Sequence, residues 1–111
     1  MKLEVGMYVR LENDVEDIVI INKIANVFET TILTENDGSI YQGEYTKENV
    51  IKASYNIIDI LEVGDYVNGF PVIHKENDIL KCGLLVQFKE NEIKSVITHE
   101  QMEQMAYKVG E

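Results

Sequence analysis

The chain has 111 residues, and its 20 acidic side chains outnumber its 10 basic ones, which gives a net charge of −10. This balance argues against non-specific nucleic-acid binding, because no surplus of cations is present to displace the counterions of a phosphate backbone. One cysteine allows no internal disulfide, and the first residues contain no apolar run typical of a signal peptide. No apolar run approaches the roughly 20 residues that cross a bilayer. These features predict a protein of the reducing cytoplasm whose partners have basic surfaces.

Two short segments of the first half recur in the second half. Leu3–Val9 (LEVGMYV) and Leu61–Val67 (LEVGDYV) agree at six of seven positions with an offset of 58 residues. Lys47–Lys52 and Lys89–Lys94 agree at five of six positions with an offset of 42. Because both pairs occur in the same order, duplication explains them better than chance, and we expect two related units.

Each unit is predicted to be a series of short strands, since β-branched and aromatic runs alternate with turn residues. The predicted strands of the first unit are Val5–Leu11, Ile18–Ala25, Phe28–Thr34, Ser39–Gln42 and Val50–Ala53. Those of the second unit are Tyr66–Val67, Val72–Lys75, Ile79–Cys82, Leu84–Phe88 and Ile93–Ile97. Residues 46–49 suit one turn of 3₁₀ helix before the last strand of the first unit.

This order of elements is typical of a Src-homology-three-like barrel. We therefore predict a mainly β fold of two tandem Src-homology-three-like small β-barrels, covering residues 1–57 and 58–111. The segment 54–60 between them is mostly apolar and has neither glycine nor proline, so it is expected to be packed between the units.

The chain is predicted to end in a short helix over residues 98–107. Thr98 and Gln101 form a capping box at its start, and Met102, Met105 and Ala106 form an apolar stripe. A helix this short needs a surface to pack on, either a barrel mouth or the groove between the units.

Matching glycines follow a valine in both units. Gly6 and Gly64 are interpreted as backbone turns or bulges before the first strand of each unit, with Asp65 and Asn68 as further turn residues.

The soft or borderline metal ligands are His74, Cys82 and His99, and their spacing matches no closed zinc pattern, although a carboxylate such as Glu76 could complete a site in principle. A Cys82–His pair lacks local support as a catalytic dyad, because acidic surroundings raise a thiol pKa. The acidic clusters at 12–17 and 35–37 lack the twelve-residue order of an EF-hand. Phosphate-binding loops, nucleophile elbows and metalloprotease motifs are also missing from the sequence. We therefore predict a non-catalytic protein without cofactor or metal.

Acidic side chains at two predicted hairpin tips are the candidate interface. The candidate partner-binding residues are Asp14, Glu16, Asp17, Glu35, Asp37 and Tyr41. Together with Glu44 and Glu48 they would form a negative face that competes for the basic nucleic-acid channel of a nuclease. A tyrosine among them would anchor the contact. The alternative, that these acids only solvate a small domain, stays open.

Four segments carry a resemblance to known proteins: Leu3–Arg10, Ile51–Gly69, Ile93–Gln101 and Tyr107–Val109. In these segments the chain resembles small proteins encoded by phages and prophages of Gram-positive bacteria. The resemblance implies a mobile-element origin and a bacterial host cytoplasm, but it transfers no activity and no site residue.

Many phage proteins of this size and acidity disable a host machine, and anti-CRISPR proteins that inhibit RNA-guided nucleases are one kind. By this analogy the expected partner is a basic host protein such as a defence nuclease, with no direct contact to nucleic acid. The alternative from another class is a self-associating structural or assembly protein of the phage. A third is a small hydrolase or metal enzyme, which would contain a bound metal.

Overall fold

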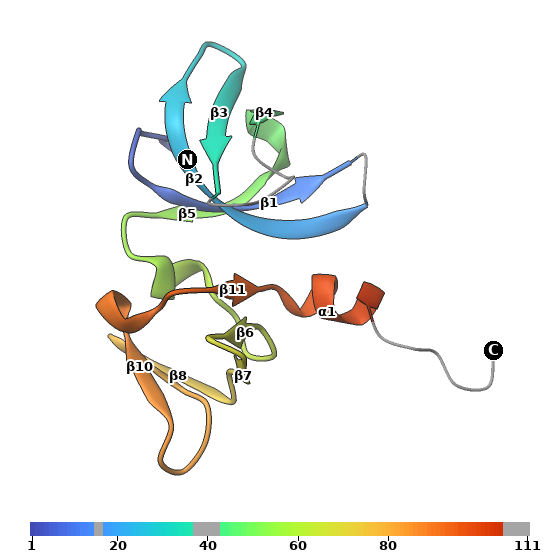
Figure 1. Ribbon diagram of the computed structural model, residues 1–111. Coiled ribbons are helices and arrows are strands. Elements are labelled where there is room, and N and C mark those ends of the chain that lie inside the picture. The colour runs from blue at the N-terminus through green and yellow to red at the C-terminus, as the bar shows by residue number, and fades with distance from the viewer. Residues whose placement is uncertain (15–16, 37–42, 106–111) are drawn as a thin grey trace, which may run out of the picture.

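The computed structural model describes residues 1–14, 17–36 and 43–105, and it shows a mainly β chain with one short α-helix (Figure 1). The strands form three antiparallel sheets, and within these ranges none of the sheets closes into a barrel. The mainly β class and the C-terminal helix are thus confirmed, and the tandem Src-homology-three-like arrangement stays a prediction. None of the helices in the described ranges is long and apolar enough to cross a membrane.

The first half is a single five-stranded sheet in the order β4-β3-β2-β1-β5. Its elements are β1 (Tyr8–Asn13), β2 (Ile18–Val27), β3 (Thr31–Glu35), β4 (Gly43–Thr46), the 3₁₀ helix η1 (Lys47–Asn49) and β5 (Val50–Ser54). Alternate residues of β1 face opposite sides of this sheet. Val9 and Leu11 enter the core of the first half, whereas Arg10 is buried on the other side.

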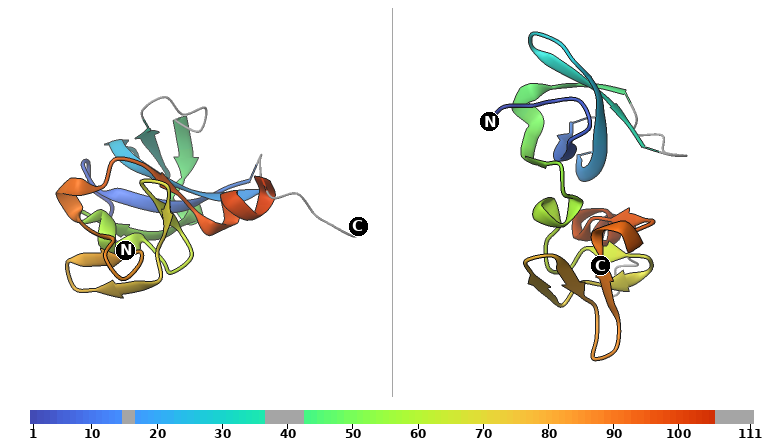
Figure 2. Two further views of the ribbon diagram at one scale, coloured as in Figure 1. Left: turned by 60° about the horizontal axis from the view of Figure 1, so that its bottom comes forward. Right: turned by 90° about the vertical axis from the view of Figure 1, so that its left-hand side faces the viewer.

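The second half has shorter strands in two three-stranded sheets, ordered β11-β6-β7 and β10-β9-β8. Its elements are η2 (Ile57–Ile60), β6 (Tyr66–Val67), β7 (Phe70–Pro71), β8 (His74–Glu76), β9 (Ile79–Lys81), β10 (Gln87–Lys89), η3 (Glu90–Glu92), β11 (Val96–Ile97) and α1 (His99–Met105). The views in Figure 2 show this half beneath the first, with η2 and α1 at the level where the halves meet.

Each half has its own apolar core, but the second core borrows from the first half. The first core consists of Val9, Leu11, Ile18, Ile20, Ile24, Ile32 and Val50. The second consists of Ile21, Ile57, Ile58, Ile60, Leu61, Val67, Val72, Leu80 and Cys82. Because Ile21 belongs to β2, one face of the five-stranded sheet packs against the second core. In the segment 54–60 the three isoleucines of η2 are buried as expected, whereas Tyr55 is 54% exposed. The predicted unit boundary falls inside η2 and stays a prediction.

The repeated LEVG segments fold into the same opening turn. Gly6 has a φ of 94° and Gly64 a φ of 100°, in the left-handed region that favours glycine. The Gly6 N–H donates to the Ile24 carbonyl at 2.9 Å, and the Gly64 N–H donates to the Val72 carbonyl at 2.9 Å. The turn predicted at both glycines is therefore confirmed.

The second repeated segment is less well conserved in structure. In the first half Lys47–Asn49 forms the 3₁₀ turn, whereas in the second half Glu90–Glu92 forms it. The structural offset is thus 43 residues, one more than the offset of the matching letters. The Lys-Glu-Asn match therefore identifies the 3₁₀ turn of the second half correctly, but it aligns the two turns one residue out of register.

Several strand predictions need correction. The predicted fourth strand, 39–42, lies outside the described residues, and β4 follows it at Gly43–Thr46. The predicted strand Leu84–Phe88 is wrong at its start, because residues 82–86 connect β9 to β10 and Leu84 is fully exposed. The first strand begins at Tyr8 rather than Val5, since the Gly6 turn precedes it.

Candidate functional site

A buried arginine joins the two halves. Arg10, the one arginine of the chain, is 1% exposed and leaves β1 on the side that faces the second half. Its Nη1 donates to Oδ2 of Asp65 at 2.7 Å, and its Nη2 donates to Oδ1 of the same carboxylate at 3.2 Å. This two-pronged geometry is the strongest form of ion pair between side chains.

Asp65 is completely buried and has two further donors. The backbone N–H groups of Glu62 and His99 donate to its carboxylate at 2.7 and 2.9 Å. Asp65 was expected to be only a turn residue. It does close the opening turn of the second half, but it also ties this turn to β1 and to the start of α1.

Two glutamates complete the surroundings of the guanidinium. Arg10 Nη2 lies 2.8 Å from Glu100 Oε1 and 3.4 Å from Glu62 Oε1, and Lys52 Nζ lies 3.3 Å from Glu62 Oε2. His99 Nε2 lies 3.1 Å from the Glu62 oxygen and 3.2 Å from the Glu100 oxygen. We call these residues, with Asp65, the ionic junction.

The charges of the ionic junction support one another. Burial lowers the pKa of Arg10, but the hydrogen bond and charge of Asp65 and the charges of the two glutamates outweigh it, so the pKa is raised overall. Burial raises the pKa of Glu62, but His99, Arg10 and Lys52 outweigh it and lower the pKa overall. Both groups are therefore held in their charged forms.

Glu62, His99 and Glu100 place three potential metal-ligand atoms within 4.8 Å of one another. The guanidinium of Arg10 already lies on the same two carboxylate oxygens. A metal ion there would have to sit beside this buried cation, so we interpret the cluster as a structural junction rather than a metal centre. Of the other ligands considered, His74 is exposed beside Glu76, and burial raises the pKa of the Cys82 thiol.

The structure places three of the six candidate interface residues. Asp14, Asp17 and Glu35 are exposed, and Asp14 accepts a hydrogen bond from Asn49 Nδ2 at 3.0 Å. Glu16, Asp37 and Tyr41 lie outside the described residues.

The three placed acids do not form one tight cluster. Glu35 pairs with Lys23 of β2, five residues along the strand from Ile18, the neighbour of Asp17. At the usual rise of a strand this separation is about 16 Å. The placed candidates are therefore spread over the first half, and Asp17 lies beside the second half, since its carbonyl accepts a hydrogen bond from Gln104 Nε2 of α1 at 3.2 Å.

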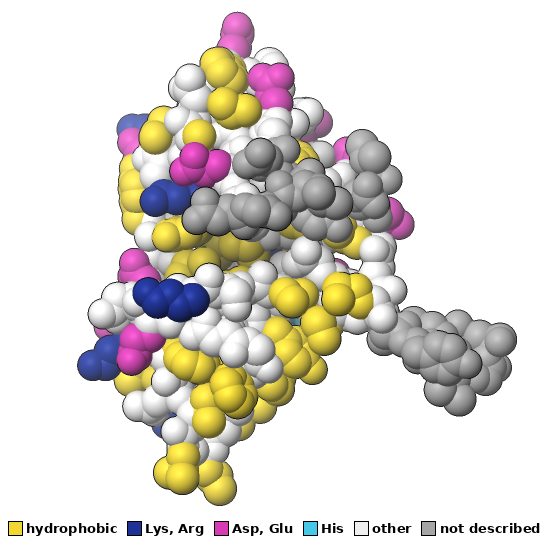
Figure 3. All heavy atoms as spheres, in the orientation of Figure 1, with side chains coloured by type: hydrophobic (Ala, Val, Ile, Leu, Met, Phe, Trp, Pro, Cys, Tyr) yellow, Lys and Arg dark blue, Asp and Glu magenta, His cyan; other side chains and the backbone are white. Residues whose placement is uncertain are grey.

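The negative charge of the first half is nevertheless concentrated. Residues 11–51 contain nine acidic side chains and two lysines, so this segment alone has a charge of −7. The exposed acids among its described residues are Glu12, Asp14, Asp17, Glu29, Glu35, Glu44 and Glu48, which we call the acidic surface. On the face drawn in Figure 3, carboxylates and hydrophobic side chains are mixed over the upper part of the molecule, and hydrophobic side chains predominate over the lower part.

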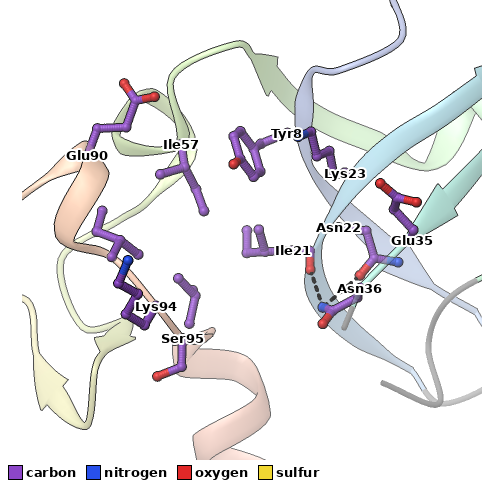
Figure 4. Close-up of a pocket in the computed structure, with 12 residues that line it drawn as sticks. Tyr8, Ile21, Asn22, Lys23, Glu35, Asn36, Ile57, Glu90, Lys94 and Ser95 are labelled. Carbon is purple, nitrogen blue, oxygen red and sulfur yellow. Dashed lines mark hydrogen bonds between the residues drawn. The ribbon is translucent and has the colours of Figure 1, made fainter. Parts of the chain in front are cut away.

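A cleft of about 470 Å³ separates the halves on one side (Figure 4). Tyr8, Ile21 and Ile57 give it an apolar floor, and Lys94 and Glu35 lie on opposite rims. Asn36 Nδ2 donates to the Ile21 carbonyl at 2.8 Å and braces one wall. The charged groups at its rims have both signs, so the cleft favours neither an anionic nor a cationic ligand.

The ionic junction was missed because its members are distant in the sequence. Two signals were present: the single arginine among ten basic residues, and the aspartate that stands in the second repeat where the first has Met7. No family model, no curated protein and no solved structure matches the chain.

Proposed function

We propose that this protein is a non-catalytic, phage- or prophage-encoded binding module that acts in the cytoplasm of a bacterial host. It engages a basic surface of a host protein, such as the nucleic-acid channel of an RNA-guided defence nuclease, through the acidic surface of its first half. The charge of −7 on residues 11–51 is the observation that carries this proposal. A surface of this sign attracts and orients a basic partner.

The few cations of this region do little to offset the acidic surface. Lys47 Nζ donates to the backbone carbonyl of Glu29 at 3.0 Å, and Lys23 lies 5.5 Å from the centre of the Tyr8 ring, on the side of the cleft. Arg10 is buried in the ionic junction. The acidic carboxylates therefore face solvent with little neutralisation from their own sheet.

We further propose that the first half is a Src-homology-three-like barrel and the second half a reduced version of it. The order β4-β3-β2-β1-β5, with η1 directly before β5, supports this assignment for the first half. In the second half β6 pairs with β11 after η3, as β1 pairs with β5 after η1. Loops at the rim of such a scaffold commonly carry function, and Asp14 and Asp17 border one of them.

The test is inhibition of purified RNA-guided nucleases from Gram-positive bacteria, measured as DNA cleavage at increasing salt. The proposal predicts inhibition that weakens steeply with salt and is lost when Asp14, Glu16 and Asp17 are all changed to Lys. The matched control changes three exposed acids far from this hairpin in the sequence, Asp78, Glu90 and Glu92, to Lys.

Both triple variants alter the net charge by the same amount, so only position distinguishes them. Full inhibition by the control and none by the hairpin variant would support the acidic surface. Equal loss in both would reduce the effect to net charge, and unchanged inhibition by the hairpin variant would refute this site.

A further inference from the structure

The far end of the second half exposes large apolar side chains. Leu84 is 104% exposed, Leu85 97%, Ile73 57% and Phe70 44%, and we call these four residues the apolar end. In Figure 1 the β9–β10 connection is the lowest part of the molecule, and in Figure 3 hydrophobic side chains cover this projection and the surface above it.

Neighbouring strands hold the apolar end together. The Ile73 N–H donates to the Lys81 carbonyl of β9 at 2.9 Å, and the Cys82 N–H donates to the Val86 carbonyl at 2.8 Å, which closes the connection that carries the two leucines. The Phe70 ring lies 6.1 Å from the Phe88 ring of β10. Leu84 and Leu85 lie outside the core, so their exposed side chains do not stabilise the fold of the single chain.

The apolar end also differs from the rest of the molecule in charge. Residues 70–89 contain three lysines and two acids, a balance of +1 with His74 neutral, against −7 for residues 11–51. Within this end Lys81 is paired with Glu76 at 3.0 Å. Two molecules that each have a charge of −10 therefore meet the least repulsion when their apolar ends approach each other.

We infer that the apolar end is a homodimer interface, with a second copy of this chain as its occupant. Contact of two identical apolar ends is self-complementary, as a two-fold dimer requires. It also leaves the two acidic surfaces at opposite poles, because the acidic surface lies in the other half of each chain. The dimer would present two acidic surfaces, and its formation is independent of any host target.

The test is the mass in solution by light scattering or sedimentation, from low micromolar to near-millimolar protein. The wild type is expected to shift from the chain mass of 12.7 kDa to twice that mass, and the shift should persist or strengthen at high salt. Leu84→Ser together with Leu85→Ser should abolish it. Because both side chains are fully exposed, the melting temperature at low micromolar protein, where the wild type is monomeric, should not fall.

A matched control changes Val5 and Met105, 56% and 70% exposed, to Ser and should leave the dimer intact. A wild type that stays monomeric throughout, a dimer that survives the Leu84/Leu85 change, or growth beyond a dimer would each overturn the inference. Salt separates this result from the proposed function, since salt weakens contacts through the acidic surface.

Discussion

The two halves of this protein begin with the same turn and then become different structures. In both, an aromatic or imidazole ring from the end of the half covers the glycine: a Cβ on Gly6 would lie 3.6 Å from Tyr55, and one on Gly64 would lie 3.5 Å from His99. The Tyr55 hydroxyl donates to Glu4 at 2.9 Å, in the position where His99 contacts Glu62. The repeat is therefore one of structure as well as of sequence.

The difference lies in the residue that closes the turn. In the first half the Sδ of Met7 accepts the Glu4 N–H at 3.3 Å, and in the second half Asp65 accepts the Glu62 N–H at 2.7 Å. A thioether sulfur is uncharged and a weak acceptor, whereas the Asp65 carboxylate also accepts hydrogen bonds from Arg10 and from the first N–H of α1. One difference between the repeats thus converts a local turn into a joint between the halves.

Removal of Arg10 is expected to have the largest effect on stability. Arg10→Met leaves Asp65 buried without its counter-ion, and loss of one partner of a buried pair costs about 3–5 kcal/mol. The measurement is urea unfolding of the wild type, Arg10→Met, Asp65→Met and the double variant.

The double variant is expected to be less destabilised than the sum of the single variants, because neither charge is then left alone. Additive losses would show that the two side chains contribute independently and would contradict the role given to the pair.

The glycines test whether the two opening turns are equivalent. Gly6→Ala and Gly64→Ala are each expected to cost about 1–2 kcal/mol, because an L-residue is strained in the left-handed region. The added methyl groups meet only ordinary contacts, at 3.6 and 3.5 Å, so the strain is the same in both halves. If one of the two substitutions lowers the free energy of unfolding by more than twice as much as the other, the two turns are not equivalent.

Acidification should weaken the ionic junction by a smaller amount. The pKa of Glu62 in the folded protein is below its ordinary value of 4.5, so the unfolded chain binds its proton more readily. Its contribution to stability is present above pH 4.5 and is lost as the pH falls through the folded pKa. In Glu62→Gln the loss of stability below pH 4.5 should be shallower than in the wild type, and an identical pH profile would contradict this contribution.

Local features were predictable from the sequence. Each opening turn depends on one glycine and on the residues next to it in the chain. The helix cap depends on Thr98 and Gln101, and the Gln101 N–H donates to Thr98 Oγ1 at 3.1 Å. The apolar stripe predicted on this helix is not buried at Met105, which is 70% exposed, and Ala106 lies outside the described residues. The helix is instead fixed by Thr98 Oγ1, which donates to the Val19 carbonyl of β2 at 2.6 Å.

Features that join distant residues were not predictable. The Arg10–Asp65 pair spans 55 positions, and no local pattern indicates which carboxylate a buried arginine meets. The strand predicted at Leu84–Phe88 failed for a related reason, since an apolar run shows no difference between a side chain that is buried and one that is left exposed. The acidic surface was visible in the sequence, because residues 11–51 lie within the predicted first unit, and the structure adds which of its acids are exposed.

The central claim is that the ionic junction makes one cooperative body from two repeated halves, and native-state hydrogen exchange tests it most directly. The amides to follow are those of Leu11 and Ile20 in the first half and of Val67 and Leu80 in the second. We expect all four to exchange with the same free energy of opening in the wild type, and the second half to open first in Arg10→Met. A wild type whose second half already opens at a lower free energy than the first would contradict the claim.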